Sequence, residues 1–155
     1  MRIRKLRKND FFLLNELDWT PLPKERDSIY LILAVDQGKC SFIAEQEGEF
    51  LGVVLATRGA DGGSIYVNHL LVKGGSRQRG VGKSLMDRLE KYAAKEGARR
   101  IWLFCHAELE GYYESRGYCE RYDFLTPELK KYIRTVKGVH AYLKEIQPAR
   151  HSGDR

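Results

Sequence analysis

The sequence lacks long hydrophobic runs. No apolar stretch approaches the roughly 20 residues that a membrane-spanning helix needs. The basic N-terminal segment, residues 1–12, contains no apolar stretch long enough for a signal peptide. We therefore expect no membrane partner and a cytoplasmic location.

Cysteine is scarce, and its spacing is uninformative. Cys40, Cys105 and Cys119 form no CxxC pair and have no clustered histidines beside them. Such a set argues against a disulfide framework and against a structural zinc site, so we expect no metal. We interpret all three as small hydrophobic residues of the core. Cys105, on an expected buried strand, is a poor nucleophile candidate because burial raises the pKa of a thiol.

Composition and charge are those of an ordinary globular domain. The chain has 155 residues, of which 43% are hydrophobic and 31% charged, enough for one domain with a real core. Its net charge of +6 permits nucleic acid or any phosphate-bearing ligand. Residues 73–83 contain basic side chains and no acid. This local patch differs from the extended basic face of a nucleic-acid reader, so we expect no nucleic-acid partner.

Hydrophobic periodicity predicts an α/β domain with a mixed sheet of six or seven strands and helices on both faces. The expected strands are Met1–Leu6, Ser41–Glu47, Glu49–Thr57, Ser64–Val72, Arg99–Cys105, Tyr118–Phe124 and Val136–Ile146. The expected helices are Phe11–Leu17 with a cap at Asn9-Asp10, a second from Pro23 to just before Gly38, Gly80–Glu96, Leu109–Ser115 and a short one from Pro127. We expect one domain over residues 1–146 and a flexible polar tail over residues 147–155.

The most informative segment runs from Arg77 to Ser84 (RQRGVGKS), between an expected strand and an expected helix. A glycine-rich turn at a helix N-terminus exposes unpaired backbone N–H groups and the positive end of the helix dipole, which favour a phosphate. Two nucleotide motifs do not fit. The P-loop requires glycine where Arg77 stands, and the dinucleotide fingerprint requires glycine where Leu85 stands.

Arg77, Gly80 and Gly82 match all three fixed positions of the pattern Q/R-x-x-G-x-G/A. In this segment the chain resembles the acetyl-CoA motif of the GNAT superfamily of N-acetyltransferases. Downstream, the stretch YYESRGY at 112–118 resembles the family's aromatic-Tyr-x-x-x-Gly-aromatic segment. The resemblance covers nearly the whole chain and is strongest over residues 67–118.

The resemblance implies a single GNAT-like domain whose splayed fourth and fifth strands leave a slot for the pantetheine arm. It implies transfer of the acetyl group of acetyl-CoA to a primary amine, by direct attack in a ternary complex, without an acyl-enzyme. The alternative is a catalytically silent acyl-CoA-binding domain of the same fold. Asn68 keeps this alternative open, since related enzymes often carry a glutamate near this position.

The resemblance also assigns roles. The backbone of Leu70, Leu71 and Val72 is expected to pair with the pantetheine amides. Tyr113 matches the tyrosine that can donate its proton to the leaving thiolate; aromatic packing is its alternative role. The residues expected at the pyrophosphate are Arg77, Gln78, Arg79, Gly80, Val81, Gly82, Lys83 and Ser84. For the basic side chains among them, a solvated loop is the alternative.

The general base is left open between His69 and a water relay. His69 titrates in the right range, but alternation places it on the face opposite to Asn68 unless a bulge intervenes. His106 stands where the family frequently has an asparagine that contacts the cofactor arm.

The acceptor is expected to be a small-molecule or peptide amine, and the resemblance leaves a homodimer open. In this fold the early helices and their loop usually shape the acceptor site. The residues to consider there are Glu16, Asp18, Trp19, Glu25 and Asp27, whose acids would suit a cationic amine or form a solvated surface.

Overall fold

The computed structural model describes residues 1–36, 38–76, 79–136 and 138–149. Within them the strands are β1 (Arg2–Lys5), β2 (Phe42–Gln46), β3 (Glu49–Arg58), β4 (Ser64–Val72), β5 (Arg100–His106), β6 (Cys119–Glu120) and β7 (Val139–Glu145). The helices are α1 (Asp10–Glu16), α2 (Asp27–Val35), α3 (Val81–Lys95), α4 (Ala107–Ser115) and α5 (Pro127–Thr135), with 3-10 turns at Gly38–Cys40 and Gly74–Ser76. No helix in these ranges has the length and apolar character to cross a membrane.

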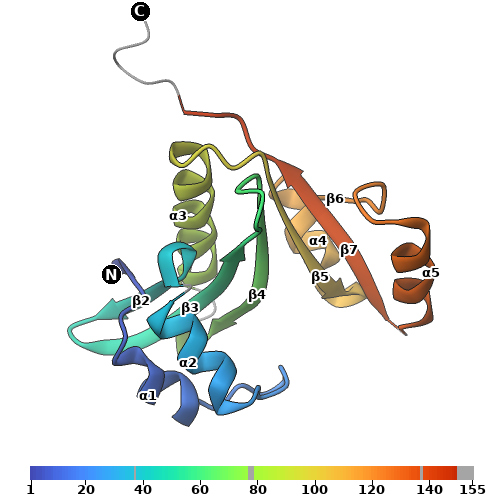
Figure 1. Ribbon diagram of the computed structural model, residues 1–155. Helices are drawn as coiled ribbons and strands as arrows, with labels where there is room; N and C mark the ends of the chain where they lie inside the picture. The colour runs from blue at the N-terminus through green and yellow to red at the C-terminus, as the bar shows by residue number, and fades with distance from the viewer. Residues whose placement is uncertain (37, 77–78, 137, 150–155) are drawn as a thin grey trace, which may run out of the picture.

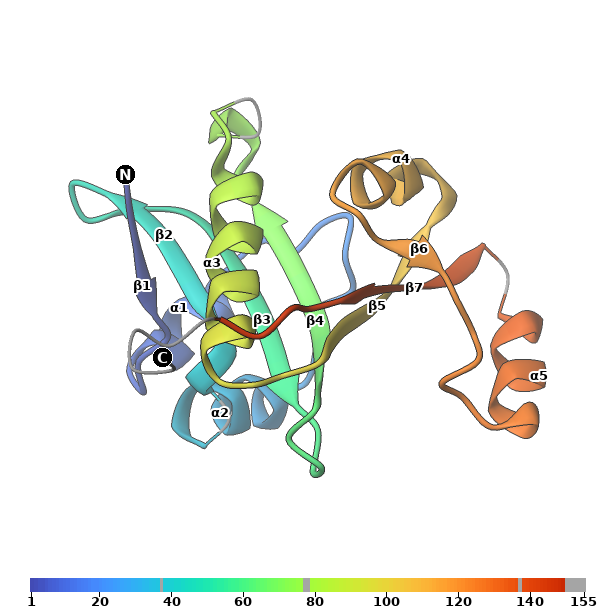
Figure 2. The same cartoon turned by 90° about the horizontal axis from the view of Figure 1, so that it is seen from above.

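The strands form one mixed sheet in the order β1-β2-β3-β4-β5-β7-β6. Every neighbouring pair is antiparallel except β4 and β5, which run parallel. Helices α1 and α2 lie on one face of the β1–β4 part and α3 lies on the other, as Figures 1 and 2 show. The predicted α/β fold with a mixed sheet and helices on both faces is therefore confirmed.

Strands β4 and β5 are joined at one end only. Their register covers Ser64–Tyr66 against Arg100–Trp102, although β4 has nine residues and β5 has seven. Beyond these pairs the two strands diverge, and Figure 1 shows the gap widening toward the end of β4. This divergence is the splayed central pair that the resemblance implies.

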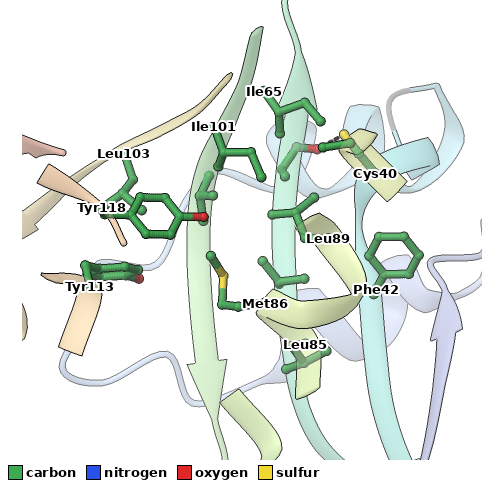
Figure 3. Packing of buried hydrophobic residues seen from close by; sticks show 14 of the residues in the cluster. Cys40, Phe42, Ile65, Leu85, Met86, Leu89, Ile101, Leu103, Tyr113 and Tyr118 are labelled. Atoms are coloured by element: carbon green, nitrogen blue, oxygen red, sulfur yellow. Dashed lines mark hydrogen bonds between the residues drawn. The ribbon is translucent and has the colours of Figure 1, made fainter. Parts of the chain in front are cut away.

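Two hydrophobic cores flank the sheet. The first packs α3 and α4 against the strands and includes Ile65, Leu85, Ile101 and Tyr118, several of which are seen in Figure 3. The second packs α1 and α2 against β2, β3 and β4. Its buried members are the residues Leu6, Leu14, Trp19, Tyr30, Leu33, Ala34, Ile43, Val53, Leu55 and Leu71.

A bulge in β4 changes which side chains face each core. Leu55 of β3 pairs with His69 and the next residue, Ala56, pairs with Val67, so Asn68 is an extra residue in β4. Before the bulge, Val67 belongs to the first core; after it, Leu71 belongs to the second. Because odd-numbered residues thus change faces, His69 lies on the same face as Leu71, toward α1 and α2.

The N-terminal helices differ from their predicted limits. Helix α2 begins at Asp27, not at Pro23, because the preceding loop is held in a conformation of its own. In that loop the Glu25 N–H donates to the Tyr30 hydroxyl (2.8 Å), and the Trp19 indole donates to the Leu14 carbonyl (2.9 Å). Asn9 makes no side-chain cap on α1.

The C-terminal strands are shorter than predicted. Strand β6 spans two residues. Tyr118 before it packs into the first core, and after Arg121, whose N–H donates to the Ala141 carbonyl (3.1 Å), the chain turns so that the Leu125 N–H donates to the Tyr122 carbonyl (3.0 Å). Cys119 lies exposed on β6, so its interpretation as a core residue is wrong, whereas Cys40 and Cys105 are buried as predicted. At the C-terminus, the Ala149 N–H donates to the Ala94 carbonyl (3.1 Å).

Candidate active site

A cleft opens where β4 and β5 diverge. Its volume is about 430 Å³. The lining residues come from the α1–α2 loop, the end of β4, the start of α3 and α4, and they are Pro21, Leu22, Leu70, Leu71, Val72, Gly80, Gly82, Lys83, Leu109, Tyr112 and Tyr113. The structure therefore brings the predicted β4 segment, part of the predicted glycine loop and the predicted tyrosine to one place.

The end of β4 has one paired and one unpaired backbone edge. On one side Leu70, Leu71 and Val72 pair with β3. On the other side β5 pairs with β4 only as far as Tyr66, so within the described residues no strand covers the edge beyond it. Backbone N–H and C=O groups on such an edge can accept an extended ligand as an additional strand.

The N-terminus of α3 points donors at the cleft. Gly80 precedes the helix with φ of 73°, a left-handed conformation that glycine adopts without strain. The Ser84 N–H donates to the Gly80 carbonyl (3.0 Å) as the first helical bond, so the amides of Val81, Gly82 and Lys83 have no helical partner. The first turn contains no acidic residue. These amides and the helix dipole favour an anion.

Gly82 leaves room beside these donors. A Cβ at this position would lie 3.4 Å from Val72 Cγ2, 3.6 Å from the Tyr112 hydroxyl and 4.0 Å from Leu70 Cδ2. A methyl group would thus fit in ordinary contact, and anything larger would enter the space between β4 and α4.

The basic side chains of the loop lie at the rim. Arg79 donates to the Gln46 side chain (2.6 Å), and Lys83, whose side chain is exposed, pairs with Asp87 (2.8 Å). Arg77 and Gln78 lie outside the described residues. The charges of Arg79 and Lys83 therefore stand next to the α3 amides while both side chains reach solvent.

Tyr113 is buried on α4 and faces the cleft. Its ring lies edge-on to Tyr112 and Tyr118, with centroid distances of 5.1 and 5.6 Å, and Figure 3 shows Tyr113 beside Tyr118. Burial raises the pKa of Tyr113 far above its usual range, so its hydroxyl stays protonated at neutral pH and can act as a donor.

Tyr112 is a cleft residue that sequence reasoning missed. Its hydroxyl is buried and has no hydrogen-bond partner in the described structure, which is unusual because buried polar atoms are normally paired. The first aromatic position of the YYESRGY segment was the signal that could have pointed to it.

Ion pairs fix α4, and with it both tyrosines, against α3. Arg116 is nearly buried and donates to Asp87 (2.8 Å) and to Glu90. Lys144 of β7 also pairs with Glu90 (2.6 Å). Since the carboxylates are on α3 and Arg116 ends α4, this network joins the two helices that contribute to the cleft.

His69 lies on the face of the sheet that α1 and α2 cover, opposite to the face that α3 covers. Its Nε2 is 3.4 Å from Glu25 Oε1, and its ring centroid is 5.4 Å from that of Trp19. Burial lowers the pKa of His69, against the opposing effect of the Glu25 carboxylate, so the ring is neutral at neutral pH. A neutral imidazole can accept a proton.

The other residues considered for the acceptor site do not line the cleft. Trp19 is buried and stacks on Tyr30 (5.3 Å between centroids), so it supports the loop. Asp18 accepts a hydrogen bond from the Thr20 N–H, while Glu16 and Asp27 are exposed. His106 is exposed and its Nδ1 lies 3.0 Å from the Gly138 carbonyl, toward β7.

The sequence model of the Acetyltransferase (GNAT) family matches residues 2–118, which is most of the chain. The chain belongs to the GNAT acetyltransferase family. A comparison with curated proteins finds no match.

Solved structures share the fold of this GNAT chain at low sequence identity. Ard1 from Thermoplasma volcanium is 13% identical with a TM-score of 0.75, over 94% of this chain and 97% of that one. The ribosomal-protein-S18-alanine N-acetyltransferase from Escherichia coli is 18% identical, with a TM-score of 0.72 over 97% of each chain. Diaminobutyrate acetyltransferase EctA from Paenibacillus lautus, solved with L-2,4-diaminobutyric acid and coenzyme A, is 18% identical, with a TM-score of 0.72 over 98% of each chain.

Members of the GNAT family bind coenzyme A, and the cleft of this member has features that suit such a ligand. The unpaired edge of β4 suits an amide-bearing arm, and the α3 amides suit a pyrophosphate. Gly82 leaves space beside those amides, and the Tyr112 hydroxyl is a buried polar group without a partner. No group of three or more His, Cys, Asp or Glu side chains within the described ranges is arranged to hold a metal ion.

Proposed function

We propose that this GNAT protein transfers the acetyl group of acetyl-CoA to a primary amine by direct attack in a ternary complex. The observation that supports this most is the cleft itself, where an unpaired strand edge, a helix N-terminus without acids and a buried tyrosine meet. In our proposal the acceptor is a small-molecule or peptide amine, with no nucleic-acid or membrane partner, and the protein is cytoplasmic.

The donor would be held along β4 and at α3. The backbone of Leu70, Leu71 and Val72 would pair with the pantetheine arm, and the loop of residues 77–84 would hold the pyrophosphate through its amides and basic side chains. The role of Arg77 and Gln78 rests on the sequence motif alone, because both lie outside the described residues.

The reaction requires that the attacking amine lose a proton and that the leaving thiolate gain one. As the amine nitrogen bonds to the carbonyl carbon and the C–S bond breaks, the Tyr113 hydroxyl would protonate the leaving thiolate. The proton of the amine would pass to His69, directly or through water. This assignment is supported by the neutral state of His69 and by the bulge that turns it toward the α1–α2 loop.

A silent acyl-CoA-binding domain is the second candidate, and Asn68 is the observation in its favour. Its side chain is an amide that donates weakly to Thr57 Oγ1 (3.4 Å) and cannot accept the proton of an amine.

Two measurements on the purified protein test the proposal. Acetyl-CoA and free CoA should raise the melting temperature more than ATP or NAD does, because a ligand of the folded state stabilises by mass action. A panel of amino acids, polyamines, aminoglycosides and peptide N-termini should then include an acceptor. A shift with acetyl-CoA but no turnover on any amine would favour the silent domain, and no shift with millimolar acetyl-CoA would reject both.

A further inference from the structure

Four half-buried aromatic rings form a platform on the α1–α2 face of the sheet. They are Tyr66, Trp102, Phe104 and Phe124, and we refer to them as the aromatic platform. The Trp102 centroid lies 4.5 Å from that of Tyr66, 5.4 Å from Phe104 and 5.1 Å from Phe124. None of the four belongs to the buried set of either core. Partly exposed rings gathered outside a core are a common feature of ligand sites.

The platform lies where β4 and β5 begin to diverge. Tyr66 and Trp102 are the last residue pair that joins the two strands. Their neighbours Ile65, Val67, Ile101 and Leu103 face the first core, so by alternation the platform faces the opposite side, toward the α1–α2 loop. It thus approaches the site from the side opposite to α3.

Glu25 lies next to the β4 end of this platform. Its Oε1 is 3.4 Å from His69 Nε2, and the bulge at Asn68 puts His69 on the same face of β4 as Tyr66. Burial, and to a smaller extent the negative charge of Glu25, raises the pKa of the Tyr66 hydroxyl. The loop holds Glu25 in place, since its N–H donates to the Tyr30 hydroxyl and its Oε1 lies 3.4 Å from His69 Nε2.

Among the residues that the structure describes, no fixed cation neutralises the charge of Glu25. In the described parts of the chain, no lysine or arginine nitrogen lies within 4.0 Å of its carboxylate, although several other acids have such partners. His69 is neutral at neutral pH, as derived above. The Glu25 side chain is 40% exposed, so a ligand can reach it. A carboxylate beside aromatic faces attracts organic cations through charge-assisted hydrogen bonds and cation–π contact.

We propose that the amine acceptor carries a second, positively charged group, which Glu25 binds at the edge of the aromatic platform. Glu25 is then a specificity-determining residue that selects diamine-like substrates over neutral monoamines. The inference rests on the proposed acetyl transfer. A different role for Glu25 is to position His69, and that role would affect all acceptors alike.

The test compares three probes that differ at the end remote from the reacting amine. These are butane-1,4-diamine, n-butylamine and 4-aminobutanoate, whose remote ends are cationic, neutral and anionic at pH 7. We expect the wild-type kcat/KM to be at least tenfold higher for the diamine than for butylamine, with 4-aminobutanoate lowest. Glu25→Gln should lower the diamine-to-butylamine ratio by about 10- to 100-fold, the effect of losing a hydrogen bond to a charged group.

Glu128→Gln on α5 is the matched control, because it removes the same charge from an exposed position on a helix that does not line the cleft, and it should keep the wild-type ratio. Glu25→Lys should reverse the order of the diamine and 4-aminobutanoate. All variants are compared by melting temperature, so that a folding defect is recognised.

Two results would overturn the inference. The first is that butylamine is acetylated and the wild-type diamine-to-butylamine ratio is near one, or that Glu25→Gln lowers kcat/KM equally for both amines. In that case the cation site is wrong and acetyl transfer stands. If acetyl-CoA raises the melting temperature and none of the probes or panel amines is acetylated, the proposed transfer fails and the cation site fails with it.

Discussion

Gly82 offers the sharpest test of where the donor binds. It is the second residue of α3, and the three atoms nearest to an added Cβ lie at 3.4, 3.6 and 4.0 Å. Gly82→Ala therefore fits without displacement, and the better helix propensity of alanine should stabilise the fold by up to about 1 kcal/mol. The indole of Gly82→Trp would extend from the same point into the space between Val72 and Tyr112.

The size of the effect follows from the bonds at risk. If the indole denies a phosphate two amide donors, each worth about 1.5–3 kcal/mol with a charged partner, affinity falls by about 3–6 kcal/mol. At about 1.4 kcal/mol for each factor of ten, the Kd for acetyl-CoA rises by about 10²- to 10⁴-fold.

Thermal shift measures this loss directly. With acetyl-CoA at 100 times the wild-type Kd, binding stabilises the fold by about 2.7 kcal/mol, which at about 2–4 °C per kcal/mol raises Tm by about 5–11 °C. For Gly82→Trp the shift should be less than about 2 °C. Gly82→Ala is the control for folding. A folded Gly82→Trp protein with the full shift would show that the phosphates bind elsewhere.

Two further predictions concern Tyr113 and His69. Tyr113→Phe keeps the ring, so the Kd for acetyl-CoA should barely change, while kcat falls toward the lower end of the roughly 10²–10⁴-fold typical of general acid catalysis, because a thiolate already leaves well. An unchanged kcat, with chemistry rate-limiting, would make Tyr113 a packing residue. The pKa of His69 is lowered from its ordinary 6.5, so the unfolded chain binds more protons and the free energy of unfolding should fall as pH drops from about 6.5 through the folded pKa. Urea titrations at pH 7.5 and 5.0 should show that the free energy of unfolding falls less for His69→Gln than for the wild type. An equal fall in both proteins would mean that burial does not shift the pKa of His69.

The parts of the fold set by local pattern were predictable. Strand β4 was predicted at Ser64–Val72 and is found there, because apolar residues bounded by glycine turns define it locally. Gly97 adopts a φ of 75° after α3, as a C-terminal cap requires. Helix α5 begins at Pro127 with the Thr126 hydroxyl accepting from the Leu129 N–H, which the proline indicated.

Features that depend on partners distant in sequence were not predictable. The extra residue Asn68 is defined by the register of β4 against β3, and the sequence of β4 alone does not reveal it. Likewise, the contact between Glu25 and His69 joins a loop to a strand 44 residues away. Motifs therefore predicted the residues that line the cleft, while the contact proposed here for the acceptor became visible only once the strands were in register.

The two cores differ in how much of the chain they unite. The buried set of the first core runs from Cys40 to Tyr142 and joins both halves of the sheet. That of the second core ends at Leu71 and takes its strand residues from β2, β3 and β4 alone. The second core can therefore loosen while the first stays intact, at a cost below that of global unfolding. Helices α1 and α2, with the loop that carries Glu25, are thus a separable unit of stability. In the proposed reaction, local opening of this unit would admit acceptors of different size, while the walls of the cleft contributed by β4, α3 and α4 remain assembled.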